Sequence, residues 1–263
     1  MRQVPEEPVR RAPGPEGGER WFRRLLRARE LVTVALLAVL AGGVWTFVAV
    51  AAAVGVGEVR ALDRTVLLAM REPSDLSDPI GPPWFEEMGR DLTALGGATV
   101  LTLVSVAAAL FLWMARRPRS VALLAFAFGG GQLLSFLLKR WFGRPRPDLV
   151  PHEAVVYSAS FPSGHSMMSA VVYLTLGALL ARVLPRARMK LLVMACAVVA
   201  TALTGVSRVY LGVHWPTDVV AGWAVGAAWA VAIWLAGDAL DRHRRAGEAP
   251  EGSGPGAPDD PSA

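Results

Sequence analysis

Charged residues and cysteine are both scarce in this sequence. Asp, Glu, Lys and Arg make up 19% of the 263 residues, whereas hydrophobic residues make up 53%. The apolar residues occur in long runs rather than on amphipathic faces, which is typical of a membrane protein and argues against a soluble domain. Cys196 is the one cysteine, so an intrachain disulfide is excluded and cysteine usage does not indicate the redox compartment.

Six stretches lack all four charged residue types over roughly the length that is needed to cross a hydrocarbon core. These stretches are residues 31–57, 92–115, 120–138, 155–181, 191–207 and 219–237. We therefore predict an all-α, polytopic membrane protein with six transmembrane helices in one bundle. The first stretch follows a long polar leader, and we interpret it as a retained anchor rather than a cleaved signal peptide.

The segment between the first two stretches has apolar residues at helical spacing on one face and polar residues on the other. The apolar face holds Leu62, Val66, Ala69 and Met70, and the polar face holds Asp63, Arg64 and Arg71. We predict a short interfacial helix here, on the outer face of the bundle.

The polar ends of the chain predict three parts: a disordered basic cytoplasmic tail over residues 1–29, the membrane domain over 30–240, and a disordered cytoplasmic tail over 241–263. With both termini in the cytoplasm, two thirds of the 27 Lys and Arg residues fall on the cytoplasmic side, as the positive-inside rule requires. These basic residues lie beside apolar runs and form no soluble basic domain, so we expect no nucleic-acid partner. We expect a bacterial plasma membrane.

Three polar segments fall on the same predicted outer face, namely residues 139–147, 161–165 and 207–218. Together they supply what a phosphate ester needs in a site without metal. Lys139, Arg146 and Arg208 are candidate cations for phosphate, and the two arginines offer forked donors. Ser163 and Gly164 lie at the start of the fourth helix, where free N–H groups and the helix dipole favour an anion.

Two histidines in different settings indicate a division between nucleophile and acid/base. Pro216 suits the first turn of the last helix, so Asp218 lies one turn from His214 and can accept a hydrogen bond from one imidazole nitrogen. The other nitrogen of His214 is then free to attack phosphorus. His165, beside the phosphate-binding helix start, can protonate the departing lipid oxygen and later activate water.

These segments resemble the signature of the type 2 phosphatidic acid phosphatases, whose site is shared by vanadium haloperoxidases. The matching patterns are Lys139-x6-Arg146-Pro147, Pro162-Ser163-Gly164-His165 and Ser207-Arg208-x5-His214-x3-Asp218. No signature position departs from the family pattern. The resemblance implies a lipid phosphatase with a phosphohistidine intermediate, in which the residues have the roles assigned above. It also implies that the reaction needs no metal and no cofactor.

Several alternatives stay open. A vanadate-dependent haloperoxidase would use the same residues, and a non-catalytic lipid-phosphate binding or transport protein could use the basic pocket without turnover. Arg144 suits either a solvated loop or the site, whereas Asp148, His152 and Glu153 are interpreted as solvated. The motifs contact phosphate and not the tail. They therefore do not distinguish undecaprenyl diphosphate, phosphatidic acid, phosphatidylglycerol phosphate or a sphingoid phosphate, and they leave the oligomeric state unknown.

Overall fold

A computed structural model describes residues 15–150 and 158–247 of the chain, and this part is almost entirely helical. Its helices are α1 (Pro15–Val56), α2 (Arg60–Leu68), α3 (Pro83–Ala94), α4 (Ala98–Met114), α5 (Pro118–Phe142), α6 (Gly164–Val183), α7 (Ala187–Tyr210) and α8 (Pro216–Gly247). Two short strands, β1 (Arg71–Glu72) and β2 (Asp75–Pro79), form an antiparallel hairpin that the sequence pattern did not predict. The predicted all-α class is confirmed apart from this hairpin.

The protein is an integral membrane protein with five or six candidate spans. In the described part of the chain, α1, α5, α6, α7 and α8 are each long and apolar enough to cross a membrane. Helices α3 and α4 pass the same test only together, and they meet at a bend of 48°. The bend lies at Gly96 and Gly97. Their N–H groups donate to the carbonyls of Thr93 and Ala94, and these hydrogen bonds close two tight turns.

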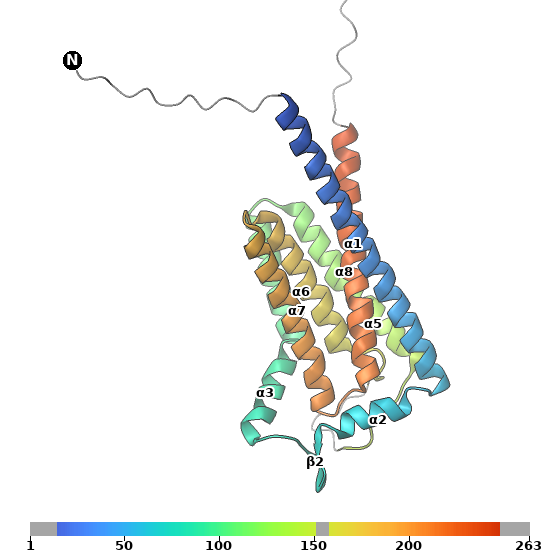
Figure 1. Ribbon diagram of the computed structural model, residues 1–263. Helices are drawn as coiled ribbons and strands as arrows, with labels where there is room; N and C mark the ends of the chain where they lie inside the picture. The colour runs from blue at the N-terminus through green and yellow to red at the C-terminus, as the bar shows by residue number, and fades with distance from the viewer. Residues whose placement is uncertain (1–14, 151–157, 248–263) are drawn as a thin grey trace, which may run out of the picture.

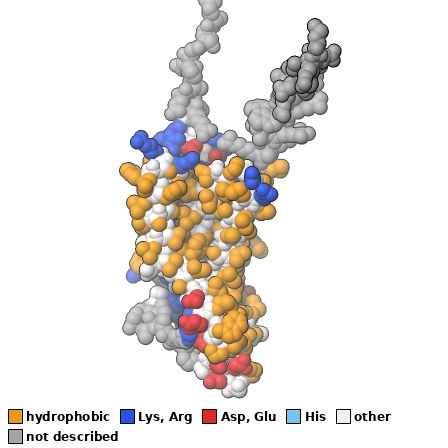
Figure 2. Space-filling view, turned by 90° about the vertical axis from the view of Figure 1, so that its left-hand side faces the viewer, with side chains coloured by type: hydrophobic (Ala, Val, Ile, Leu, Met, Phe, Trp, Pro, Cys, Tyr) orange, Lys and Arg blue, Asp and Glu red, His pale blue; other side chains and the backbone are white. Residues whose placement is uncertain are grey.

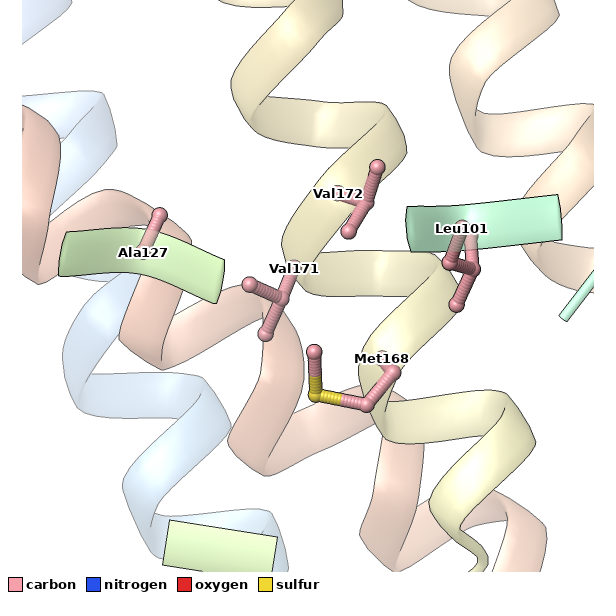
Figure 3. Packing of buried hydrophobic residues seen from close by; sticks show 5 residues of the cluster. All are labelled: Leu101, Ala127, Met168, Val171 and Val172. Atoms are coloured by element: carbon pink, nitrogen blue, oxygen red, sulfur yellow. The ribbon is translucent and has the colours of Figure 1, made fainter. Parts of the chain in front are cut away.

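Helix α6 lies at the centre of the bundle, with α5, α7 and α8 packed around it, and α1 crosses α8 on the outside (Figure 1). More than half of the apolar part of α6 is buried, whereas none of residues 30–56 of α1 is. The core beside α6 joins Met168, Val171 and Val172 to Leu101 of α4 and Ala127 of α5 (Figure 3). The chemistry must therefore be sought at the ends of these helices, because the middle is packed with apolar side chains.

Two glycines of α8, Gly222 and Gly226, let this helix approach α6 closely. A Cβ atom on Gly226 would lie 2.5 Å from the carbonyl oxygen of Met167, and one on Gly222 would lie 2.7 Å from that of Ser163. In a lipid environment such small residues permit the van der Waals contact that holds helices together. This contact fixes the start of α6 against the start of α8.

The surface is divided along the length of the bundle (Figure 2). On the face shown, hydrophobic side chains cover the middle, Lys and Arg gather at the upper end, and Asp and Glu side chains gather at the lower end together with some Lys and Arg. The start of α1 and the end of α8, as far as the structure describes them, both lie at the upper end (Figure 1). The hydrophobic band is the surface that a bilayer would cover.

The structure fixes the ends of several helices. The fourth charge-free stretch runs from residue 155, and the fourth helix was predicted to start at Ser163 and Gly164; α6 does begin at Gly164, after a loop over residues 158–163. Residues 151–157, with His152 and Glu153, lie outside the described part. Helices α1 and α8 extend past the predicted domain limits, to Pro15 and Gly247. The division into a membrane domain and two tails stays a prediction, and residues 1–14 and 248–263 lie outside the described part.

The short helix expected before the second stretch is present as α2, and its orientation is informative. Leu62 on the apolar face is exposed, whereas Asp63 on the polar face is fully buried against the protein. The side of α2 with Leu62 therefore points away from the bundle, and the side with Asp63 and Leu67 points into it. An interfacial position for α2 stays a prediction.

Candidate active site

The candidate site lies where one end of α5, α6, α7 and α8 meets the loop between α5 and α6. Gly143 ends α5 with a left-handed backbone (φ 56°), and its N–H bonds to the carbonyl of Lys139. The chain then carries Arg144 and Arg146 beneath the helix ends. Ser163 caps α6 by accepting a bond from the Ser166 N–H at 3.4 Å, and its own N–H bonds to the Asp218 carbonyl at 2.9 Å. The ends of α6 and α8 are thus tied together.

Gly164 and Lys139 form one side of the site. A Cβ atom on Gly164 would lie 3.4 Å from Lys139 Cε, so the ammonium of α5 faces the first residue of α6. Lys139 Nζ donates to the carbonyl of Ala159 at 2.6 Å, which holds it near the helix start. Free N–H groups, the positive end of a helix dipole and a cation are therefore next to each other, as an anion site requires.

Arg146 and His214 form the opposite side. Arg146 Nη1 lies 2.8 Å from the Val213 carbonyl and 3.2 Å from His214 Nε2. A guanidinium can only donate hydrogen bonds, so His214 Nε2 must be the acceptor and carry the lone pair. Two further bonds, from Nε and Nη2 to the Ser158 carbonyl and hydroxyl, fix the plane of the guanidinium.

The second nitrogen of His214 faces Asp218. Nδ1 lies 3.4 Å from Asp218 Oδ2 and 3.3 Å from Ser160 Oγ, and the Ser160 hydroxyl donates to the same carboxylate oxygen. The His214 and Asp218 side chains are both buried. Because Nε2 accepts, Nδ1 carries the proton and donates to the carboxylate. The sequence predicted the pairing of His214 and Asp218 from the spacing of one helical turn, and the geometry agrees.

The electrostatics keep His214 neutral at rest. Burial lowers the pKa of His214 from its ordinary value of 6.5 to about 3; the hydrogen bond and charge of Asp218 oppose this, and the charges of Arg146 and Arg208 add to it. Burial likewise lowers the pKa of Arg146, and the charge of Asp218 opposes this change. A neutral imidazole with an unprotonated Nε2 is the form that a nucleophile requires.

His165 and Arg208 complete the set. His165 follows Gly164 in the first turn of α6, so it lies beside the helix start that faces Lys139, and the N–H of His214 bonds to the Arg208 carbonyl at 3.3 Å. Arg208 is buried, and its Nη1 donates to Thr93 Oγ1 at 2.8 Å. Its Nε has no hydrogen-bond partner among residues 15–150 and 158–247. A buried guanidinium N–H without a partner is costly unless a ligand satisfies it.

The structure therefore brings together every residue that the sequence singled out, and it adds several that the sequence missed. Thr93 and Gly96 reach the site from the α3–α4 bend, where a Cβ on Gly96 would lie 3.2 Å from the Cβ and carbonyl oxygen of His165. Ser160 bonds to Asp218 from the loop before α6. No sequence pattern marks these positions, because each depends on a contact between distant segments. Arg144, which the sequence left open, is bonded to Asp218.

Two other features of the described chain bear on ligands. Among the described residues, no three His, Cys, Asp or Glu side chains lie together as a metal site would need. An apolar cavity of about 870 Å³ lies between α1, α6, α7 and α8, with Arg182 and Lys190 at one end and Trp223 at the other. None of the candidate catalytic residues lines it, so the cavity is separate from the polar site.

Known proteins are similar to this chain in both sequence and fold. Residues 120–242 match the family model described as the PAP2 superfamily. The chain is 37% identical over 185 residues to phosphatidylglycerophosphatase B of Bacillus subtilis, covering 68% of this chain and 85% of that protein. It is 31% identical over 175 residues to a lipid A 1-phosphatase of Rhizobium etli, covering 56% of this chain and 71% of that protein.

A crystal structure of a transmembrane PAP2-type phosphatidylglycerolphosphate phosphatase from Bacillus subtilis superposes with a TM-score of 0.68 at 32% identity. The match covers 78% of this chain and 96% of that chain. The fold and site thus define a membrane-bound enzyme of the phosphatase class. The chain belongs to the PAP2 superfamily.

Proposed function

We propose that the chain hydrolyses a membrane lipid phosphate or diphosphate through a phosphohistidine intermediate on His214, without a metal. The observation that carries this proposal is the orientation of that imidazole. Nδ1 lies 3.4 Å from Asp218, and Nε2 lies 3.2 Å from Arg146. Arg146 is one of the residues that would bind phosphate oxygens. The lone pair therefore points to the place where the cations would hold phosphorus.

The steps follow from this geometry. Phosphate oxygens bind to Lys139, Arg146 and Arg208, to the N–H of Gly164 and to the hydroxyl of Ser163, whose own N–H is already bonded to the Asp218 carbonyl. His214 Nε2 attacks phosphorus, the bond from phosphorus to the lipid oxygen breaks, and that oxygen takes a proton from the imidazolium of His165. Neutral His165 then removes a proton from water, the water oxygen attacks phosphorus, and the phosphorus–nitrogen bond breaks. Asp218 stabilises the positive charge that His214 gains in between.

The membrane arrangement belongs to the same proposal. Counting the bent pair α3–α4 as one span gives six spans, which returns both termini to the side with most Lys and Arg. This side is the cytoplasm, and the catalytic helix ends then face the outside of a bacterial plasma membrane. The substrate is a lipid such as phosphatidylglycerol phosphate, lipid A or a polyprenyl diphosphate, since relatives that carry the names of such phosphatases support this class.

The test is release of inorganic phosphate from a panel of these lipids by detergent-purified protein in the presence of a chelator. We expect release by wild type and none by His214→Ala, because the variant lacks the attacking nitrogen. Loss of activity on chelation, or full activity in His214→Ala, would contradict the mechanism. Halide oxidation with vanadate, measured on the same preparations, tests the haloperoxidase alternative, and we expect none.

A further inference from the structure

A chain of buried charges leads from α2 to the catalytic pair. Asp63 Oδ2 lies 2.6 Å from Arg144 Nη2, and Arg144 Nη1 lies 2.6 Å from Asp218 Oδ1. The exposed fraction is 0% for both carboxylate side chains and 12% for the Arg144 side chain. Each carboxylate thus meets a different nitrogen of one guanidinium. The guanidinium of Arg144 therefore bridges two carboxylates, and such hydrogen bonds between ionised groups are short and orient both partners.

Thr217 closes the network into a fixed unit. Its N–H and hydroxyl donate to Asp63 at 2.9 and 2.7 Å, and its oxygen accepts from Arg144 Nη1 at 2.9 Å. Because Thr217 precedes Asp218 in the first turn of α8, Asp63 is bonded to that turn as well as to the arginine. The carboxylate of Asp63 is therefore buried with a bond from Arg144 and two bonds from Thr217.

The charges explain why two carboxylates are needed. Asp218 alone with Arg144 would be a neutral ion pair, and its pull on a cationic His214 would be weakened. Asp63 supplies the second negative charge, so the three groups together carry one net negative charge beside the imidazole. In a buried setting an unbalanced charge at this distance acts strongly, because little water screens it.

We propose that Asp63 and Arg144 are positioning residues for the nucleophile: Arg144 fixes the carboxylate of Asp218, and Asp63 balances Arg144 so that Asp218 keeps its negative charge toward His214. This proposal rests on the proposed phosphohistidine mechanism. Neither residue belongs to the set that binds phosphate. Their loss should therefore slow phosphoryl transfer without weakening the affinity for phosphate.

The experiment compares Asp63→Asn with Asp78→Asn, an exposed carboxylate of the same outer segment. Single-turnover phosphate release from dioctanoyl phosphatidic acid, with enzyme in saturating excess, gives a rate constant that does not depend on the fraction of folded enzyme. We expect this rate constant to fall 10- to 100-fold in Asp63→Asn and to stay within twofold in Asp78→Asn. The inhibition constant of inorganic phosphate should stay within threefold in both.

The outcomes separate the two hypotheses. If wild type releases phosphate and His214→Ala does not, the proposed function stands and the inference is tested alone. A wild-type rate constant in Asp63→Asn overturns the inference, as does a reduced amplitude with an unchanged rate constant, which a purely structural role would give. Should Asp63→Asn not fold, Arg144→Lys is measured in the same way. Lysine keeps the charge but cannot bridge the two carboxylates as the guanidinium does. A wild-type rate constant in Arg144→Lys overturns the inference too.

Discussion

Gly164→Ala separates a phosphate-binding role of the α6 start from a merely structural one. The added Cβ would lie 3.4 Å from Lys139 Cε and 3.7 Å from Ser135 Oγ, which are ordinary van der Waals distances. Gly164 is the first residue of α6 and needs no left-handed backbone, so alanine fits its conformation. We expect the free energy of unfolding to be unchanged or to rise by about 0.4–1 kcal/mol, since alanine has less freedom in the unfolded chain.

Activity should nevertheless fall. The new methyl group would lie 4.0 Å from Lys139 Nζ, so it would take up space at the place where we expect a phosphate oxygen to bind. Removing one preorganised N–H donor from a reacting oxyanion costs on the order of 10²-fold in rate. We therefore expect kcat/KM for lipid phosphate to fall about 10²-fold.

The assay measures phosphate release and thermal unfolding on the same detergent preparations. The control is Gly129→Ala in α5, where an added Cβ would meet no atom within 4 Å. This variant should keep wild-type activity. If Gly164→Ala were as stable as wild type and kept kcat/KM within threefold, the start of α6 would not be the phosphate site and our reasoning would be wrong.

Three further predictions concern the nucleophile, a cation and the helix packing. Because the pKa of His214 in the folded protein is lowered, its neutral form adds stability above pH 6.5 that is lost as the pH falls toward 3; ¹³C-histidine NMR of the phosphate-free enzyme should show no titration of this ring near pH 6.5. Arg208→Lys keeps the charge but loses the bond to Thr93 and the forked donors, so KM should rise about tenfold, measured by steady-state phosphate release. Gly226→Ala places a Cβ 2.5 Å from a carbonyl oxygen of α6 and should lower stability by about 1–3 kcal/mol in thermal unfolding, whereas Gly129→Ala should not.

The sequence predicted much of the membrane fold because hydrocarbon imposes a simple requirement. Charge-free stretches of spanning length mark helices directly, and α5, α7 and α8 follow the predicted stretches with only longer ends. The start of α6 was predicted from a local signal. The segment before it is free of charge from residue 155, and the Pro-Ser-Gly segment marks the point at which the helix begins.

The residues of the candidate site were found because they are chemically specific and lie in three short motifs. Asp63 was assigned to a solvent or headgroup face, because helical spacing separates two faces of a helix but does not show which face the protein covers. Arg144 was left open between a solvated loop and the site. Its partners lie on α2 and α8, far away in sequence, so only the folded chain connects them.

The central claim is that phosphorus becomes bonded to His214, and the direct test is to trap that bond. The His165→Gln variant is mixed with p-nitrophenyl phosphate and chelator, then quenched in base and digested for mass spectrometry. This leaving group needs no proton, so the first step proceeds, whereas hydrolysis lacks its base and the intermediate accumulates. We predict a base-stable, acid-labile phosphoryl group on His214; phosphate release with no adduct on that residue, or an adduct on another residue, would contradict the account.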